Sequence, residues 1–311
     1  IQGTGTQSRL SQFVVTTPLE YQGYTHVSDS LNSINETDFT GWLQLTNGNN
    51  RLPTSTTLYL GGRLLVAEDS GKRVYAGATG AVGVLVLAGV NQELAGLIAI
   101  GTGRWNRVIN QHPSAASTLT LNIASGVTNV YSGYLGGIGG MFVYPDDPAT
   151  ANNLNLTKTG SGTLVLQAPS NTYTGITTVQ GGTLVVNADQ RNSGLITVQN
   201  GAVLGGTGRV GAVTVWSGGY LSPGASPGVL TAHGDVTLQG GSVFQVELNG
   251  TTAGSEYDQL SIVAGSLKLQ QDLGVRPDLV VTLGFTPSPG NSFDIVTGLS
   301  GFDWSFDGYF Q

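Results

Sequence analysis

The second half of the sequence consists of short runs in which apolar and polar residues alternate. In Thr163-Leu164-Val165-Leu166 and Thr183-Leu184-Val185-Val186, the leucine and every second residue fit one buried face, while threonine fits the solvent side. A period of two residues is typical of β-strands with one buried face. Each run is closed by Gly-Gly, Asn-Gly or Ser-Gly, which is the pattern of strands joined by turns. The pattern predicts an all-β chain from about residue 117 onward.

Several of these runs resemble one another. Similar phrases occupy residues 177–184 (TTVQGGTL), 197–204 (TVQNGAVL), 214–221 (TVWSGGYL) and 237–244 (TLQGGSVF), and their starts at Thr197, Thr214 and Thr237 lie 17 and 23 residues apart. A repeat of about 20 residues made only of strands and turns predicts an elongated β-solenoid whose coils stack on one another. A β-sandwich also fits short strands with frequent turns. The recurrence of one phrase favours the solenoid.

The composition agrees with a folded all-β protein. Only 10% of the 311 residues are charged, against about 25% in an average soluble protein, and 48 are glycine. The net charge is −7, and only three lysines are present, so nucleic acid is not an expected partner. There are no cysteines for disulfides or thiol chemistry. The longest apolar run, residues 81–90, is about half a membrane span, so no transmembrane segment is expected.

The pattern divides the chain into four expected segments. Residues 1–40, with polar positions such as Asn32 and Glu36, are expected to form an N-terminal cap or extension that covers the edge of the stack. Residues 41–116 are expected to form irregular coils, and residues 117–302 to form the regular β-helix. Residues 303–311 form the expected C-terminal end. Residues 143–153 are the most loop-like insertion.

Two phrases carry a family resemblance. Residues 156–166 (LTKTGSGTLVL) and 171–184 (NTYTGITTVQGGTL) resemble the passenger-associated transport repeat of bacterial autotransporters. Downstream, residues 204–208, 221–228 and 247–260 resemble the stretch that follows such repeats. The positions that carry the resemblance are Lys158, Gly160, Gly162, Leu164, Asn171, Tyr173, Gly175, Gly182, Leu184, Pro223, Gly224, Pro227 and Gly228.

The resemblance implies a right-handed parallel β-helix that is displayed on, or released from, the surface of a Gram-negative-type bacterium. It implies no single activity, because adhesins, toxins and stalks share this scaffold. Typical members end in a membrane β-barrel, and this sequence reaches Gln311 without one. The expectation is therefore a piece of a longer chain, a member that lost the barrel, or a protein exported by another route.

Few residues suggest metal or nucleophile chemistry. The histidines His26, His112 and His233 are far apart, and none has a second histidine at ligand spacing, so no metal or cofactor is expected. A Ser/His/Asp triad would form only in the fold, and no Gly-x-Ser-x-Gly phrase supports one. The glycine-rich phrases at 160–162 and 205–208 are not followed by Lys-Ser/Thr, so they are interpreted as coil corners.

Carboxylate pairs are the sharper enzymatic candidates. Glycoside cleavage needs two carboxyl groups about 5 to 10 Å apart. Asp146-Asp147 and Glu68-Asp69 fit turns better than a catalytic pair. The acids Asp235, Glu247 and Asp258 are 12 and 11 residues apart and would share a face only if the coils had that length. The phrase Arg104-Trp105-Asn106-Arg107 fits either a sugar-stacking surface or core packing.

The sequence therefore predicts a secreted or surface-exposed bacterial β-helix with a structural or adhesive role, and no enzymatic activity. It would act as a stiff spacer or as a building block of a cell-surface layer or filament. The expected partners are further copies of the chain, packed end to end or laterally, and cell-surface glycans or proteins. The alternative is a carbohydrate-active enzyme, a polysaccharide lyase or hydrolase, with a groove on the flank of the β-helix.

Overall fold

The computed structural model of the chain describes residues 2–3, 10–29, 40–62, 64–69, 72–76, 82–101, 106–137, 152–224 and 226–298. All the regular secondary structure in these ranges is β-strand, and no helix in them could cross a membrane. The chain divides into two compact units. Unit 1 comprises residues 1–122, 129–156 and 172–175, and unit 2 comprises residues 123–128, 157–171 and 176–311.

Unit 1 is built mainly from parallel strands. One sheet has the order β1-β3-β5-β10, with bounds Gln2–Gly3, Tyr24–Asp29, Thr57–Leu60 and Gly96–Ala99. A second sheet has the order β14-β11-β8-β4-β2, with bounds Tyr134–Leu135, Arg107–Ile109, Val82–Val86, Thr40–Leu45 and Leu10–Val15. Strand β9 (Gln92–Leu94) pairs in parallel with β12 (Ser117–Asn122). Strands β6 (Leu64–Asp69) and β7 (Lys72–Ala76) form an antiparallel hairpin.

The core of unit 1 surrounds strand β8, whose residues are all buried. Trp42, Val84 and Ile109 pack in one cluster there. The guanidinium of Arg107 lies 6.0 Å from the centre of the Trp42 ring and is itself buried. Strands β13 (Thr128–Tyr131) and β15 (Leu154–Thr159) include residues of both units.

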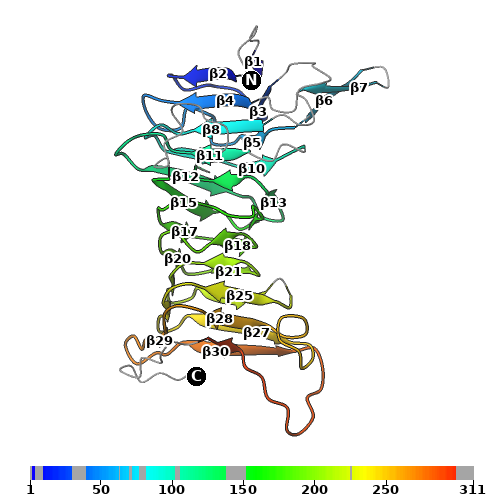
Figure 1. Cartoon of the computed structure of the whole chain (residues 1–311), viewed down its shortest axis with the longest axis vertical. Helices are drawn as coiled ribbons and strands as arrows, with labels where there is room; N and C mark the ends of the chain where they lie inside the picture. Colours follow the sequence, from blue (N-terminus) through cyan, green and yellow to red (C-terminus); the bar gives the residue numbers. More distant parts are fainter. Residues whose placement is uncertain are drawn as a thin grey trace. The chain divides into compact units, whose positions relative to one another are not determined.

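Unit 2 contains three sets of parallel strands that follow one another around each coil, as Figure 1 shows from green to orange. The first set is β17-β20-β23-β26-β29: Thr177–Val179, Ile196–Val198, Val213–Val215, Val236–Leu238 and Leu267–Leu269. The second is β16-β18-β21-β24-β27-β30: Thr163–Leu166, Gly182–Val186, Ala202–Gly206, Tyr220–Pro223, Val243–Leu248 and Asp278–Leu283. The third is β19-β22-β25-β28-β31: Asp189–Gln190, Arg209–Val210, Val229–Ala232, Gln259–Ile262 and Val296–Thr297.

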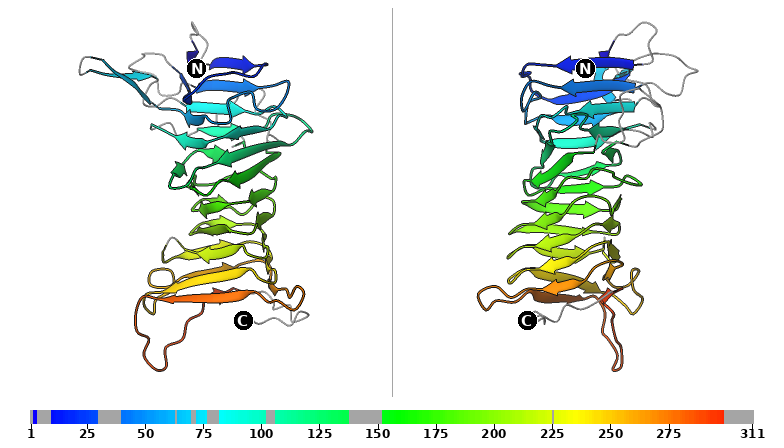
Figure 2. Two further views of the ribbon diagram at one scale, coloured as in Figure 1. Left: turned by 180° about the vertical axis from the view of Figure 1, so that it is seen from behind. Right: turned by 60° about the vertical axis from the view of Figure 1, so that its left-hand side comes forward.

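The strands of unit 2 stack on one another (Figure 2). They pair in register, so equivalent residues of successive coils form columns. One inner column runs from Leu164 through Leu184, Leu204 and Leu221 to Phe244, and all its members are buried. Alternate residues face outward, because successive side chains of a strand point to opposite sides. This parallel stacking confirms the predicted all-β parallel β-helix; the β-sandwich alternative would require face-to-face antiparallel sheets.

The glycines that recur in the similar sequence segments form the corners of the coils. Gly201, Gly218 and Gly241 have φ of +75°, +73° and +76°, in the left-handed region where a β-carbon is unfavourable. They follow the strands β20, β23 and β26 by three residues each and precede the next strand of the coil. The glycine punctuation of the sequence therefore marks real changes of chain direction.

The four expected segments stay a prediction. Asn32 and Glu36 of the expected cap, residues 143–151 of the expected insertion and the C-terminal residues 303–311 lie outside the described residues. The same is true of Arg104, Trp105 and the pair Asp146-Asp147.

Candidate functional site

The lysine of the repeat phrase points into the coil. Lys158 is fully buried, and the N–H of Gln180 donates to its carbonyl at 2.8 Å, which places Lys158 beside Val179 in an inner column. Its ammonium donates to the carbonyls of Thr159 at 2.7 Å, Gly160 at 2.9 Å and Gly181 at 3.1 Å. Burial lowers the pKa of Lys158 to about 8, so the side chain is charged at neutral pH. The lysine thus ties the corners of two coils together.

The glycines of the same phrase allow these corners to approach closely. A β-carbon at Gly162 would collide with the carbonyl of Ala124, and one at Gly182 would collide with the carbonyl of Gly162. The N–H of Gly162 donates to the Ile123 carbonyl at 2.9 Å, which fixes this approach. Leu164 and Leu184 follow directly as buried partners in register.

The second phrase of the repeat is also mainly buried. Asn171 is 3% exposed, and its N–H donates to the Asp189 carbonyl at 2.8 Å. Tyr173 is fully buried in unit 1, where its N–H donates to the Leu135 carbonyl at 3.2 Å. A β-carbon at Gly175 would collide with the carbonyl of Leu154. We propose that these positions have a structural role in the repeat.

The Pro-Gly phrases downstream surround one buried carboxylate. Asp258 is 2% exposed; its Oδ1 accepts from the Gly228 N–H at 2.9 Å and its Oδ2 from the Glu247 N–H at 2.9 Å. A β-carbon at Gly224 would collide with Asp258 Oδ1. Burial is the main cause that raises the pKa of Asp258. Pro223 is buried at the end of β24, and Pro227 directly precedes Gly228.

The histidines do not come together as a site. His26 is buried and donates from Nε2 to the Gly61 carbonyl at 2.8 Å. His112 accepts the Ala115 N–H on Nδ1 at 2.8 Å, as in a local turn. The backbone N–H of His233 donates to the Val210 carbonyl at 2.7 Å. Within the described ranges, no three His, Asp or Glu side chains cluster in a way that could hold a metal ion.

The three downstream acids lie at strands of three different sets. Asp235 directly precedes β26 and pairs with Lys268 Nζ at 2.6 Å. Glu247 belongs to β27, where its Oε2 accepts from Ser226 Oγ at 2.6 Å. Asp258 precedes β28. Glu247 and Asp258 are neighbours, joined by the backbone bond from the Asp258 N–H to the Glu247 carbonyl at 2.9 Å. The side chains of Glu68 and Asp69 lie outside the description.

The described part of the Arg104–Arg107 phrase is buried. Asn106 accepts the Gly83 N–H on Oδ1 at 2.8 Å, and Arg107 packs over Trp42. These two residues therefore belong to the core packing of unit 1. The core-packing interpretation concerned Trp105, which lies outside the described residues, so it stays a prediction.

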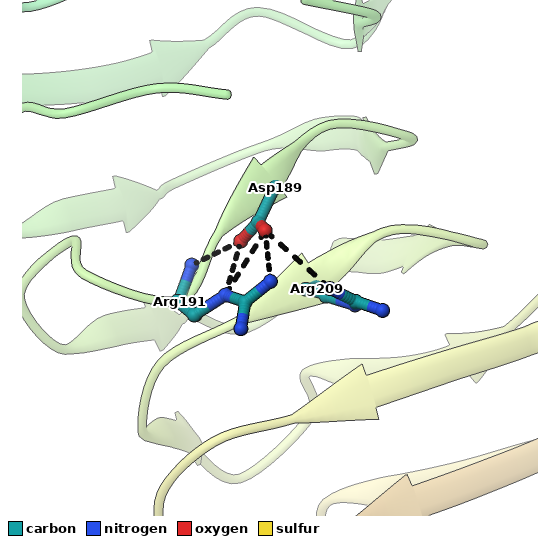
Figure 3. A network of polar contacts seen from close by, with 3 residues as sticks. All are labelled: Asp189, Arg191 and Arg209. Carbon is teal, nitrogen blue, oxygen red and sulfur yellow. Dashed lines mark hydrogen bonds and ion pairs between the residues drawn. The ribbon is translucent and has the colours of Figure 1, made fainter. Parts of the chain in front are cut away.

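A charged network lies on the third set of strands in unit 2 (Figure 3). Asp189 and Arg209 are register partners on β19 and β22. The Arg191 guanidinium binds both carboxylate oxygens of Asp189, with Nε at 3.0 Å from Oδ1 and 2.9 Å from Oδ2, and Nη2 also contacts Oδ2. Arg209 Nη1 lies 3.7 Å from Asp189 Oδ2. The hydrogen bond from Arg191 is the main cause that lowers the pKa of Asp189.

The most regular surface of unit 2 is the outer side of the first set of strands, which we call the ladder face. Each coil contributes three side chains at alternate positions, and the backbone bonds continue the register of the strands by one residue at each end. In chain order, the five rows are Ile176, Thr178 and Gln180; Leu195, Thr197 and Gln199; Ala212, Thr214 and Trp216; Asp235, Thr237 and Gln239; Ser266, Lys268 and Gln270.

Two of the three columns of the ladder face consist mainly of like side chains. Its middle column has four threonines followed by Lys268, and its third column has glutamine in four rows and Trp216 in one. Neighbouring rows are about 4.8 Å apart, and the columns roughly 6.6 Å apart. The sequence interpretation did not identify this face. The four similar segments nevertheless align Gln180, Gln199, Trp216 and Gln239 at one position, which is the pattern that could have revealed the third column.

The comparisons with known proteins agree with the fold. Residues 156–186 match the family described as Passenger-associated-transport-repeat. The chain carries a passenger-associated transport repeat. The predicted resemblance to autotransporter passenger domains is confirmed, and with it the location outside or at the surface of a Gram-negative-type bacterium.

Two relatives share part of the chain. The Adhesin BmaC autotransporter of Brucella suis biovar 1 (strain 1330) is 40% identical over 89 residues, which are 26% of this chain. The Extracellular serine protease of Serratia marcescens is 37% identical over 93 residues, which are 30% of this chain. The chain spans only 2% of the adhesin and 9% of the protease.

Proposed function

We propose that the chain is an adhesive and structural passenger segment, which acts as a stiff spacer or as a building block of a cell-surface layer or filament. The observation that carries the proposal is the in-register stacking of unit 2, which repeats outward threonine side chains on successive coils. Many weak contacts at a fixed spacing give strong attachment when several engage together. The adhesin relative supports this role.

The proposal can be tested with microspheres that carry the purified chain at several surface densities. We expect the beads to be retained under flow on layers of animal cells or bacterial cells, and retention to rise more steeply than the density of the chain, because attachment is multivalent. Beads coated with the heat-unfolded chain at the same density are the control. Retention equal to that of the unfolded control on every surface would contradict the proposal.

A carbohydrate-active enzyme is the second candidate, and one observation favours it. Glu247 lies beside the buried Asp258, and its charge adds to the burial that raises the pKa of Asp258. A carboxyl of raised pKa next to a second carboxylate is the arrangement of glycosidases. Both oxygens of Asp258, however, already accept backbone N–H groups, which supports a structural role. The protease relative is a different kind of enzyme.

The enzymatic candidate predicts release of reducing ends, or of unsaturated sugars, from a polysaccharide. We expect no release by the wild-type chain. Release that disappears in the Glu247→Gln variant would favour the enzyme over the adhesive role.

A further inference from the structure

We propose that the ladder face binds a neutral, hydroxyl-rich polysaccharide, with Trp216 as its stacking platform. The inference rests on the proposed adhesive function, for which it names the class of partner. Threonine hydroxyls and glutamine amides can both donate and accept hydrogen bonds, as sugar hydroxyls do. Their repetition from coil to coil offers the same contact many times to a linear polymer of similar units.

The exposed apolar side chains support a binding role for this face. Trp216 is 51% exposed, Ile176 50% and Leu195 39%. Among the described residues from 176 to 270, which contain the five rows, the exposed large apolar side chains are Ile176, Leu195, Trp216 and Val263. The first three belong to the ladder face. Exposed tryptophan beside polar groups is typical of binding hot spots. Its flat ring fits the apolar face of a sugar ring.

The charges of the face favour a neutral partner. Asp235 and Lys268 are its only ionisable side chains, and they neutralise each other through the contact at 2.6 Å. The hydrogen bond from Lys268 is the main cause that lowers the pKa of Asp235, so this carboxylate stays ionised near neutral pH. The chain as a whole has a net charge of −7, which repels anionic polymers at low ionic strength.

Turn glycines border four of the five rows of the face. Glycines follow the third column directly or after one residue, at Gly181, Gly201, Gly218 and Gly240. A β-carbon at Gly201 would meet nothing within 4 Å, whereas one at Gly218 would meet the Asn200 side chain and one at Gly240 the backbone of Asp272 and Val275. The register between strands is continuous, without a bulge, so the rows are evenly spaced.

A second copy of the chain fits this face less well. Interfaces between identical subunits are more apolar than the general surface, with depletion of charged residues at their centre. The ladder face has only three large apolar side chains, at the ends of different rows, and its middle column is formed by threonine and lysine. Its chemistry matches a hydroxylated chain more closely than another protein surface.

The test measures binding of the whole chain to defined polysaccharides. Hydroxyethyl cellulose, galactomannan and dextran serve as neutral probes, and polygalacturonate serves as the charged probe, in affinity electrophoresis and titration calorimetry. We expect at least one neutral probe to bind more tightly than polygalacturonate. We expect Trp216→Ala to weaken that binding about tenfold or more, the usual effect of removing a hot-spot aromatic residue, and Trp216→Phe to retain most of it.

Three further variants distinguish an effect on the ladder face from an effect on the fold. Tyr220→Ala is the matched aromatic control, because Tyr220 points outward from the same coil on β24, beyond the corner at Gly218. Thr214→Val removes one hydroxyl from the middle column, and Thr231→Val removes one from β25, outside the face. We expect Thr214→Val to weaken binding and both controls to bind like the wild type. The thermal unfolding midpoint checks that each variant is folded.

Several results would overturn the inference: no binding of any neutral probe, tighter binding of polygalacturonate, or the same affinity for wild type and Trp216→Ala. A wild-type dimer that Trp216→Ala dissociates, seen by sedimentation velocity, would also overturn it, since a second copy would then occupy the face. If beads coated with the Trp216→Ala variant were still retained by cells, the polysaccharide site would be contradicted, but the adhesive function would not. Retention of wild-type beads no higher than that of beads coated with the heat-unfolded chain would contradict the adhesive function.

Discussion

Asp258 accepts a hydrogen bond from the backbone N–H of Gly228, 30 residues earlier in the chain, at 2.9 Å. The two residues belong to phrases that the sequence resemblance treated separately. The buried carboxylate therefore explains why a Pro-Gly phrase and a Tyr-Asp phrase occur together: one forms the loop, and the other supplies the acceptor that holds it.

Asp258→Asn should destabilise the protein. Asparagine keeps one acceptor oxygen and places an amide N–H₂ where the other oxygen was, so one of the two backbone N–H groups loses its partner. An unsatisfied buried donor costs about 1–3 kcal/mol, which the urea unfolding midpoint would reveal. Asp272→Asn, at an exposed side chain, is the control and should unfold like the wild type. Equal midpoints for both variants would show that the Asp258 carboxylate does not hold the loop.

Lys158→Met should also be destabilising, although methionine suits an aliphatic column. Three partly buried carbonyls would lose the ammonium that they share, and the expected loss is about 1–3 kcal/mol in the free energy of unfolding. The matched control is Lys268→Met, whose half-exposed ion pair with Asp235 should contribute about 0–1 kcal/mol. A more stable Lys158→Met protein would mean that burial of the charge costs more than its hydrogen bonds contribute.

The contribution of Lys158 should depend on pH in the alkaline range. Burial lowers its pKa to about 8 in the folded protein, while the unfolded chain keeps the ordinary value of 10.5. Between these values the unfolded state binds more protons, so the stability of the wild type should rise with pH relative to Lys158→Met. The gain approaches about 3 kcal/mol by pH 10.5 and is measured by urea unfolding from pH 7.5 to 10.5. A constant difference between the two proteins would contradict the lowered pKa.

Gly162→Ala should be strongly destabilising for a steric reason. Its β-carbon would collide with the Ala124 carbonyl, a backbone atom that cannot rotate away. Overpacking of this kind costs about 1–3 kcal/mol. Gly181→Ala is the matched control, since its β-carbon would lie 3.4 Å from the Gly160 carbonyl, at the edge of ordinary contact. Thermal unfolding should show a large shift for the first variant and a small one for the second; the reverse order would refute the close approach.

The strands and their stacking could be predicted from the sequence because both depend on local patterns. The alternation of apolar and polar residues around Leu164 and Leu184 indicated the buried face, and the recurrence of similar segments indicated which residues pair. The contacts of Lys158 could not be predicted. The period of two places this residue on the inner side, but a lysine there needs acceptors, and one of them, Gly181, comes from the next coil.

The ladder face could be predicted only in part from the sequence. Its threonines were visible in the echoing phrases, and their shared direction follows from the period of the strand. Trp216 was visible as well, but only the backbone register shows that it takes a glutamine's place in an otherwise uniform column. Exposure of Ile176 and Leu195 on the same side depends on what the rest of the coil leaves uncovered, which no local pattern contains.

In-register stacking also makes a single turn of the chain the natural module for change over evolutionary time. Thr178, Thr197 and Thr214 occupy equivalent positions in successive coils. If the residues from Thr197 to Val213 were deleted, Thr214 would take the place of Thr197 and pair with Thr178. Whole turns can thus be gained or lost by recombination between similar gene segments. The corners absorb differences in length, because the register holds although Thr197, Thr214 and Thr237 lie 17 and 23 residues apart.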